Sequence, residues 1–555
     1  MKNTRGSALC LFLVSALWVS CAEEKPSTDQ PADQPQSREG KLRILLNSDG
    51  GDAALMAFEP PITPEQLNRA VNEIEGTQVD VFIECIQWSD EQMLYPTKVT
   101  EVYAKPITED HKTDFKNNPG MRRWAQNVDG LLEQGKDPLE IWAQRSHEAG
   151  MQFWPSLRMN DIHKDWTERW PSLRSQWERE RPHIRLGWDV PDRYLRSVQR
   201  PGKPSHGYSW AMNYALEEVR RRKLAIIEEV CTNYDVDGFE MDFLSHPMYF
   251  KKGDAARGMP LMTEFVRQVR ASLDQIGEQK GRRLTLLVRV LPRIDLCEEI
   301  GLDVRTWIKE GVVDMVAPAT RGYLDMNGDW AAFVDLAKGT TVEISGGLSD
   351  LYVRDYTGQK TARASIEMLR AAASAAWQSG VTSLHLFNYD AHATGKGKPG
   401  TLFSPDELQA LKEMGDPEKI ARKDKHYYIT REMGGLTPES GGEMQLPTEI
   451  TEANQTKELS FIVGDDVGSA KQDGVLESTS LLLSLEGYDR WDDNLRVELN
   501  GQGLRGQPEG DTIRFQDVVP NQGLNLLAVT LRGRPTSRQD PIRIQGVELL
   551  IDYRD

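Results

Sequence analysis

Four carboxylates lie within ten residues of this chain, between Tyr234 and Phe243, in a run that is otherwise mostly apolar. Glu240 and Asp242 are two residues apart, so on an extended strand both side chains point to the same side. Burying two carboxylates is costly unless they have partners or a function. Hydrolysis of a glycosidic bond requires two carboxyl groups, one as acid and one as nucleophile or base. The run is therefore the first candidate for a catalytic site.

The elements around this run alternate between strands and helices. Eight apolar, strand-like runs separated by helical patterns are typical of a (β/α)8 barrel, the TIM barrel, whose strands are covered on both faces. Strands are expected at residues 43–48, 79–88, 151–158, 236–243, 284–290, 313–319, 342–345 and 383–389. Helices are expected at residues 64–75, 138–149, 214–233, 261–279, 304–310, 330–337 and 361–379. A doubly wound open sheet is the alternative, but no GxGxxG turn follows the first strand. We therefore predict an α/β fold, with a (β/α)8 barrel at residues 41–424.

In such a barrel the reactive residues lie at the C-terminal ends of the strands and just beyond them. The catalytic residues expected from these positions are Asp242, Glu240, Asp161 and Asp390, and the substrate-binding residues are Trp88, Arg158, Asn160, His163, His246, Arg289, Arg321 and Asn388. The acid and the nucleophile more often come from different strands, so the preferred pair is Asp242 with Asp161 or Asp390, ahead of Glu343. Glu240 would then position a sugar hydroxyl or an arginine. Neither a metal ion nor a cofactor is expected.

Charges near the barrel mouth predict how the carboxylates ionise. Arg158 or Arg289 would hold Asp242 ionised, whereas Glu240, flanked by like charge, would have a raised pKa. Two alternatives stay open: Glu240 pairs with an arginine inside the barrel, and Glu343 is a buried salt-bridge partner instead of a catalytic group. The arginines would suit a sulfated or uronic-acid glycan, or would serve only the carboxylates.

A long insertion, at about residues 160–212, separates the third strand from the next helix. It is rich in arginine and contains Trp166, Trp170, Trp177, Trp188 and Trp210. A loop of this length is usually functional or contains short elements of its own. The tryptophans would either form a local core or stack on sugar rings, for which flat aromatic faces are suited.

The pattern changes at about residue 425, where helical periodicity stops. Short alternating strands are expected at residues 459–463, 480–485, 495–499, 512–515, 524–531 and 542–551. Turn signals such as Asn500-Gly501 separate them, which is typical of an all-β sandwich. We predict a C-terminal sandwich domain at residues 425–555, similar in pattern to galactose-binding-like modules, that binds glycan or braces the barrel.

The N-terminus is expected to be a targeting segment. A basic start precedes an apolar run at residues 8–19, which is too short to span a bilayer comfortably. Residues 1–22 are interpreted as a signal peptide, cleaved after Ala22 or, preferably, processed as a lipoprotein signal with lipid attached to Cys21. Residues 23–40 would form a disordered tether. Both interpretations predict export to the periplasm, or to the outer membrane or cell surface, of a bacterium.

The overall charge and the cysteines exclude other classes of protein. A net charge of −18 and a sequence pI of about 5.2 argue against a nucleic-acid binder, which normally carries a basic patch. After the N-terminal segment the cysteines are Cys85, Cys231 and Cys297, whose spacing does not match a zinc or redox motif. They are expected to be buried free thiols.

One part of the chain resembles a known family. The run Asn213-Tyr214-Ala215-Leu216-Glu217-Glu218-Val219-Arg220, followed by Tyr234-Asp235-Val236-Asp237-Gly238-Phe239, is similar to the bacterial "family 10-like" glycosyl hydrolase group. In that group an Asn-Pro-Glu-Val-Arg helix leads into a Tyr-Asp-Val-Asp-Gly strand that ends in acidic residues. The resemblance covers residues 213–243, and it implies a TIM barrel, a carbohydrate substrate and Asp242 as a catalytic residue. Phe243 replaces the second of the group's paired aspartates, and Leu244 stands where a chitinase-like DGxDxDxE strand would have Glu.

Three hypotheses about function remain. The leading one is an exported glycoside hydrolase that acts on a polysaccharide or oligosaccharide through paired carboxylates. The second is a metal-assisted barrel lyase or isomerase, with Glu240, Asp242 and Asp390 around a divalent ion. The third is a non-catalytic, glycan-binding surface lipoprotein. The fold alone does not choose among them.

Overall fold

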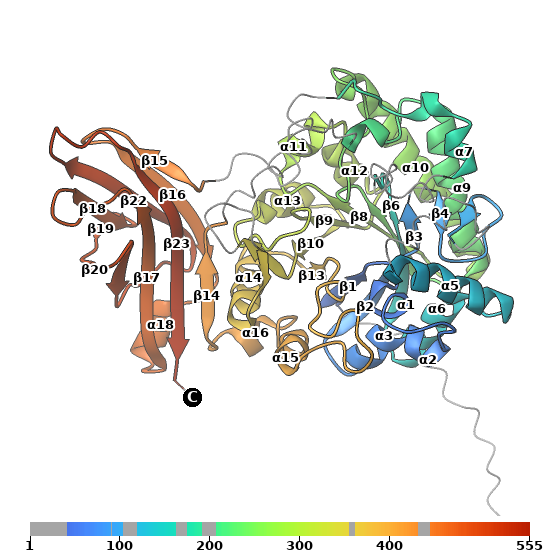
Figure 1. Ribbon diagram of the computed structural model, residues 1–555, viewed down its shortest axis with the longest axis horizontal. Coiled ribbons are helices and arrows are strands. Elements are labelled where there is room, and N and C mark those ends of the chain that lie inside the picture. Colours follow the sequence, from blue (N-terminus) through green and yellow to red (C-terminus); the bar gives the residue numbers. More distant parts are fainter. Residues whose placement is uncertain are drawn as a thin grey trace, which may run out of the picture. The chain divides into compact units, whose positions relative to one another are not determined.

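The computed structural model describes residues 41–554 apart from 90, 104–118, 163–174, 191–206, 354–360 and 431–444. Within it, eight parallel strands close into a barrel in the order β1-β13-β10-β9-β8-β7-β6-β2 (Figure 1). These strands are β1 (Ile44–Ser48), β2 (Val79–Cys85), β6 (Gln152–Arg158), β7 (Gly238–Asp242), β8 (Thr285–Val290), β9 (Met315–Pro318), β10 (Glu343–Leu348) and β13 (Ser383–Leu386). Each overlaps a predicted strand, and the (β/α)8 barrel is confirmed.

Large apolar side chains fill the N-terminal half of the barrel interior. They form a cluster of Leu45, Val81, Ile83, Trp154, Leu287, Met315 and Ala317. Gly238, the first residue of β7, makes room for the largest of them, because a Cβ there would lie 2.7 Å from the indole ring of Trp154 and 2.8 Å from the carbonyl oxygen of Thr285. This packing leaves the inward positions nearer the C-terminal strand ends to polar residues.

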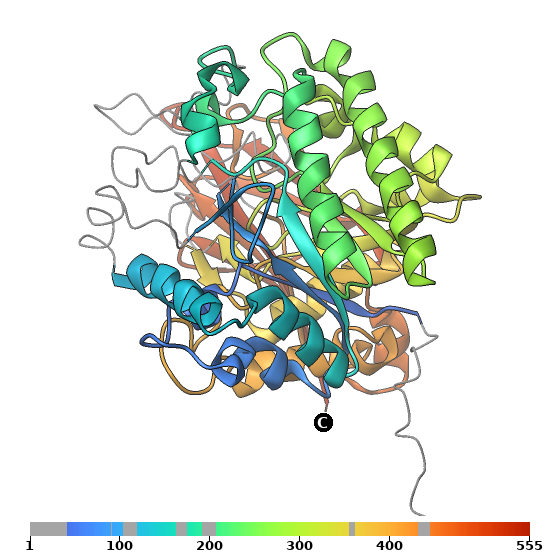
Figure 2. The ribbon, with the colours of Figure 1, turned by 90° about the vertical axis from the view of Figure 1, so that its right-hand side faces the viewer.

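Helices surround the barrel, and α9 and α10 lie side by side on its outside (Figure 2). The helices are α1 (Asp52–Leu55), α2 (Pro64–Leu67), α3 (Arg69–Ile74), α5 (Pro119–Glu133), α6 (Pro138–Glu148), α9 (Glu217–Asn233), α10 (Ala255–Lys280), α11 (Ile294–Glu299), α12 (Val304–Glu310), α13 (Trp330–Ala337), α14 (Ile366–Gln378), α15 (Pro405–Glu413) and α16 (Pro417–Ile420). None of the helices in the described ranges has both the length and the apolar character needed to cross a membrane.

Most predicted helices are confirmed, with α12 and α13 at the predicted bounds. The helix predicted at 64–75 is interrupted at Asn68, between α2 and α3. The helix predicted at 361–379 begins only at Ile366, because Thr361–Arg363 is β12, which pairs with β11 (Leu351–Val353). The prediction missed α5 and α15, although Ser404 and Glu407 form a capping box at the start of α15 that the sequence signals.

Short elements follow the second and third barrel strands. They are β3 (Gln87–Ser89), β4 (Gln92–Met93) and β5 (Glu101–Val102), which form one small sheet, and then α7 (Gln176–Arg179), η3 (Pro182–Ile184) and η4 (Gly207–Trp210) of the insertion.

The described tryptophans of the insertion differ in their surroundings. The Trp177 ring faces the guanidinium groups of Arg181 and Arg222, which lie 5.4 and 4.9 Å from the ring centroid, so it belongs to a local packed cluster. Trp188, in contrast, is 56% exposed. Trp166 and Trp170 lie outside the described residues.

The C-terminal strands form two antiparallel sheets, so the predicted all-β sandwich is confirmed. One contains β14 (Lys425–Tyr428), β15 (Thr448–Ile450), β17 (Leu476–Glu486), β20 (Gln507–Glu509), β21 (Thr512–Gln516) and β23 (Ile542–Tyr553), and the other contains β16 (Thr456–Val463), β18 (Asn494–Leu499), β19 (Gln502–Gly503) and β22 (Gly523–Gly533). A short helix, α18 (Val467–Gln472), connects β16 to β17. All six predicted strands are present, and the strands missed are the short β14, β15, β19 and β20.

Cys85, Cys231 and Cys297 are buried and unbonded, as predicted. Burial raises the pKa of the Cys85 and Cys231 thiols to about 12. Because the thiolate is the reactive form, these cysteines are inert at neutral pH.

Candidate functional site

The carboxylates of β7 occupy two successive inward positions. Glu240 is in register with Ser156 of β6 and Leu287 of β8, and Leu287 belongs to the apolar cluster inside the barrel. Asp242, two residues further, is in register with Arg158 and Arg289. The alternation of side chains along a strand therefore directs Glu240 and Asp242 to the inside of the barrel, with Asp242 at the C-terminal end.

Both oxygens of the buried Glu240 carboxylate are already occupied. Oε1 accepts from Asn47 Nδ2 at 2.8 Å and from Ser156 Oγ at 2.6 Å, and Oε2 contacts His385 Nε2 at 2.5 Å. Burial favours the neutral acid, but these bonds and the positive charges of His385 and Arg289 outweigh burial and lower the pKa of Glu240. The expected raised pKa is therefore wrong, and the partner inside the barrel is a histidine, not an arginine.

Asp242 is buried as well, but only one of its oxygens is occupied. Oδ1 accepts from the backbone nitrogens of Leu244 at 2.8 Å and Ser245 at 3.1 Å, and from Arg289 Nη1 at 3.0 Å. Among the described residues, nothing donates a hydrogen bond to Oδ2. A buried carboxylate oxygen without a partner costs free energy, and this one lies at the strand end where barrel enzymes act. Oδ2 is thus a fixed hydrogen-bond acceptor with unused capacity at the end of β7.

Arg289 holds Asp242 in this orientation. Its Nη2 donates to the carbonyl oxygens of Thr320 and Arg321, both at 3.0 Å, and its guanidinium lies 3.5 Å from the centroid of the Phe387 ring. The Arg321 side chain contacts His246, since its Nη2 lies 2.6 Å from His246 Nε2. The predicted Arg289, Arg321 and His246 therefore form one contact chain beside Asp242.

Arg158 is committed to two other carboxylates. Its guanidinium pairs with Asp49, which follows β1, and its Nη1 lies 3.2 Å from Oδ2 of Asp161. Burial lowers the pKa of Arg158, but Cys85, followed by the charges of Asp49, Asp161 and Asp242, outweighs burial and raises it. The sequence analysis missed Asp49, although the Asp49-Gly50-Gly51 turn directly after the first strand signals it. Gly50 and Gly51 have φ of 71° and 72°, a conformation that favours glycine and brings Asp49 back toward Arg158.

Asp390 follows the last barrel strand and belongs to a hydrogen-bonded cluster with Ser48, Asp49 and Glu84. Asn388 adopts a left-handed conformation, with φ of 50°, which asparagine tolerates better than most residues. Two residues later, Asp390 Oδ2 accepts from Ser48 Oγ at 2.8 Å and Oδ1 from the Asp49 nitrogen at 3.3 Å. Ser48 Oγ also contacts Oε1 of the buried Glu84 at 3.1 Å. Sequence analysis missed Glu84 because it searched only residues at the strand ends.

The other predicted substrate-binding residues make contacts within the protein. Asn160 uses its amide to hold the backbone of Met212 and Met248, so it ties the end of the insertion to the loop after β7. Trp88 packs against Trp124, with ring centroids 4.2 Å apart. The backbone nitrogen of Asn388 donates a weak bond to Asn47 Oδ1, at 3.4 Å, while the Asn388 side-chain Oδ1 has no hydrogen-bond partner among the described residues. His163 lies outside the described residues.

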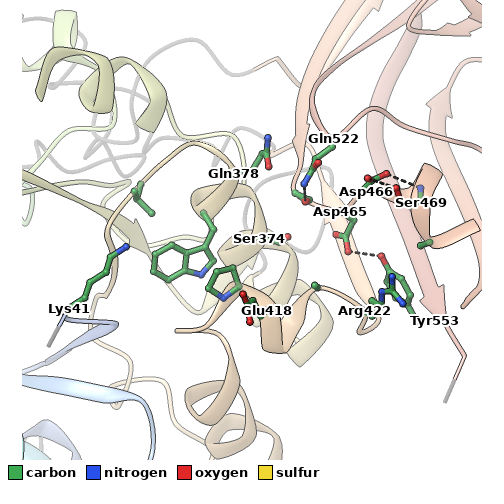
Figure 3. A pocket seen from close by; sticks show the side chains of 16 residues that line it. Lys41, Ser374, Gln378, Glu418, Arg422, Asp465, Asp466, Ser469, Gln522 and Tyr553 are labelled. Carbon is green, nitrogen blue, oxygen red and sulfur yellow. Dashed lines mark hydrogen bonds between the residues drawn. The ribbon is translucent and has the colours of Figure 1, made fainter. Parts of the chain in front are cut away.

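The described residues contain no group of three or more His, Cys, Asp or Glu side chains placed to hold a metal ion. A cavity of about 610 Å³ lies away from the strand ends, lined by α14, α16 and residues 464–470 (Figure 3). It includes none of the predicted site residues. The candidate site is therefore the inward-facing cluster at the C-terminal strand ends.

No family model matches the chain, and no curated protein matches it. Three solved structures similar to it are the glycoside hydrolase domain of PgaB (BpsB) from Bordetella bronchiseptica, an alpha-L-fucosidase isoenzyme 2 from Paenibacillus thiaminolyticus and a cycloisomaltooligosaccharide glucanotransferase from Paenibacillus sp.. Their sequence identities are 13%, 9% and 10%, and their TM-scores are 0.40, 0.40 and 0.33. The matches cover 68%, 89% and 91% of this chain, and 99%, 100% and 57% of those chains. Likenesses this low carry no argument about activity, and the barrel fold rests on the strand order itself.

Proposed function

We propose that this protein is a glycoside hydrolase that uses Asp242 as nucleophile or base. The observation that carries the proposal is the buried Asp242 carboxylate, whose Oδ1 is fixed by Arg289 and two backbone N–H groups while its Oδ2 has no hydrogen-bond partner among the described residues. Fixing one oxygen leaves the other free to attack a sugar carbon, or to take a proton from a water that attacks the sugar carbon.

The proposed general acid is Asp390 and not Asp161. An acid must hold a proton at the working pH, and a neighbouring cation opposes this because it favours the carboxylate. Asp161 lies 3.2 Å from the Arg158 guanidinium. Asp390 instead shares the Ser48 hydroxyl with a second carboxyl group, that of Glu84. Glu240, fully bonded within the barrel, is assigned to positioning.

A neutral glycan suits the site better than a sulfated or uronic-acid glycan. Two of the three expected anion-binding arginines, Arg158 and Arg289, are committed to carboxylates and backbone carbonyls. Their charge is therefore already neutralised within the protein.

The proposal extends to family and location. The run at residues 213–243 supports membership of the "family 10-like" glycosyl hydrolase group, and the N-terminal segment supports export with a lipid anchor at Cys21. Metabolic labelling with a fatty acid, compared between the full chain and its Cys21→Ala variant, tests the anchor. Label on the variant would contradict it.

The activity is tested by reducing-end release from neutral, uronic and sulfated polysaccharides, with and without EDTA. We compare the wild type with Asp242→Asn and with Glu343→Gln, which changes an exposed carboxylate at the opposite end of the barrel. The expected result is release that is insensitive to EDTA, about 10²–10⁴-fold slower in Asp242→Asn and unchanged in Glu343→Gln.

The other outcomes separate the alternatives. Activity that is lost to EDTA would indicate the metal-assisted enzyme. Binding of a glycan without release, by wild type and variant alike, would indicate a lectin-like protein. Release that survives Asp242→Asn would contradict the assignment of Asp242 while keeping the class.

A further inference from the structure

Glu84 is a buried carboxyl group for which the proposed reaction has so far no use. Its neighbours on β2, Ile83 among them, face the inside of the barrel, so Glu84 faces away from it. Glu84 is in register with Ser48 of β1, and its Oε1 accepts from the Gly51 nitrogen at 2.8 Å. The Ser48 hydroxyl lies 3.1 Å from Glu84 Oε1 and 2.8 Å from Asp390 Oδ2.

Counting protons restricts how these groups ionise. A serine hydroxyl has one proton, so it donates to only one of its two carboxyl neighbours at a time. If Glu84 and Asp390 were both ionised, Ser48 Oγ would donate to one carboxylate only. Its contact with the other carboxylate would then place two oxygen lone pairs against each other inside the protein. Both contacts are hydrogen bonds only if one carboxyl group keeps a proton, which it donates to Ser48 while Ser48 donates to the other.

We propose that Glu84 and Asp390 share one proton through the Ser48 hydroxyl, and that Glu84 is the positioning residue that keeps Asp390 available as the general acid. This inference rests on the proposed function, because it assigns the proton source of the same site. In the exchange, Glu84 gives its proton to Ser48 Oγ as Ser48 gives its own to Asp390 Oδ2, so the pair retains one proton and one negative charge. Asp390 can then transfer a proton to the leaving-group oxygen of the glycoside.

The charges around Glu84 agree with this arrangement. Burial, followed by the negative charge of Asp390, raises the pKa of Glu84 well above its ordinary value, and the bonds from Ser48 and Gly51 only partly oppose this. The titratable groups that face it are Asp390 from the loop after β13 and Asp49 from the loop after β1. Arg158, which pairs with Asp49, places a positive charge next to this network. Two like charges joined in this way titrate as a unit.

The pH dependence of kcat/KM tests the inference in Glu84→Gln and Ser48→Ala. The basic limb of the profile reports loss of the proton from the acid. Removing the second carboxyl group or the bridge should move this limb to lower pH by about one unit, whereas Glu343→Gln should leave it in place. Ser48→Ala retains both carboxyl groups, so it serves if Glu84→Gln does not fold. A fall in kcat/KM with an unmoved basic limb would show a merely structural role and overturn the inference.

Infrared spectroscopy tests the shared proton without any substrate. At neutral pH, the wild type minus Glu84→Gln difference spectrum should contain the carbonyl band of a protonated carboxylic acid. A difference spectrum without this band would overturn the inference even if the protein cleaves glycans. If the band is present but no glycan is cleaved, the shared proton stands and the proposed function fails.

Discussion

Two buried carboxylates, one in the barrel and one in the sandwich, differ in how many of their oxygens accept hydrogen bonds. In the sandwich, Asp465 Oδ1 accepts from Lys425 Nζ at 2.8 Å and Tyr553 OH at 2.7 Å, and Oδ2 from Tyr427 OH at 2.5 Å (Figure 3 shows the bond to Tyr553). Lys425 also donates to the carbonyl oxygens of Ile420 and Lys423, so all three of its protons are used. In the barrel, Asp242 is as deeply buried and also paired with a cation, yet one of its oxygens is unbonded among the described residues.

The difference separates a closed ion pair from an open one. A buried ion pair is tolerated when hydrogen bonds satisfy its remaining lone pairs and protons, as at Asp465. Such a closed network has no capacity left for a ligand. The open oxygen of Asp242 leaves a cost that the folded protein bears until a ligand or water arrives. Burial of a charge is therefore common to both regions, which differ in whether every carboxylate oxygen is bonded.

The largest contrast is expected between Asp242→Asn and Asp465→Asn. In Asp242→Asn, the introduced amide can place its NH2 where Oδ2 now lacks a partner, but the charge opposite Arg289 is lost, so stability should fall by less than in Asp465→Asn, while activity falls about 10²–10⁴-fold. Asp465→Asn turns an NH2 toward groups that donate and removes the charge opposite Lys425, which should cost about 3–5 kcal/mol of stability. Urea unfolding and kcat per folded molecule measure the two effects.

This contrast has a clear failure. If both substitutions destabilise the protein equally and leave kcat of the folded fraction unchanged, the open oxygen of Asp242 has no catalytic meaning. A glycoside hydrolase would then need another carboxylate as its nucleophile or base.

The second prediction concerns the cation of the closed network. Lys425→Met leaves Asp465 buried without its charge partner and should destabilise the protein by about 3–5 kcal/mol. Adding Asp465→Leu should restore most of that loss, because an apolar pair of similar volume needs no bonds. Thermal and urea unfolding of the two single variants and the double variant give the coupling energy. If the stability losses of the two single variants simply add in the double variant, Lys425 and Asp465 do not stabilise each other.

Much of the architecture follows from the sequence, whereas the bonding of the site does not. The eight barrel strands are local patterns of apolar residues, so they can be recognised one at a time. The partners of Glu240 cannot, because Asn47, Ser156 and His385 come from three other strands and meet it only through the register of the closed barrel. Glu84 was overlooked for a related reason, since its role depends on Ser48 and Asp390, which are distant from it in the sequence and meet it only in the folded barrel.

Glu240 allows the same comparison within the barrel. Both of its carboxylate oxygens are bonded, and it lies one inward position before Asp242, whose Oδ2 is not. Its folded pKa is lowered, so its contribution to stability is present above the ordinary glutamate value of 4.5 and is lost as the pH falls through the folded pKa. Glu240→Gln should therefore cost about 1.5–3 kcal/mol at neutral pH and progressively less in acid. Urea unfolding of wild type and variant between neutral and acidic pH measures the difference. A difference that stays constant with pH, or grows in acid, would contradict an ionised Glu240.

The smallest effect is expected at Glu343, which we predicted to be a buried salt-bridge partner. The structure corrects this: Glu343 is exposed at the N-terminal end of β10, where its Oε2 accepts from Thr382 Oγ1 at 3.1 Å. An exposed hydrogen bond of this kind is replaced by water at little cost, so Glu343→Gln should change stability by less than about 0.5 kcal/mol and leave activity unchanged. Paired urea and activity measurements on this variant and Asp242→Asn compare the two ends of the same barrel. If Glu343→Gln lowers activity as Asp242→Asn does, removal of any barrel carboxylate lowers activity. The unbonded Oδ2 of Asp242 would then have no specific role in catalysis.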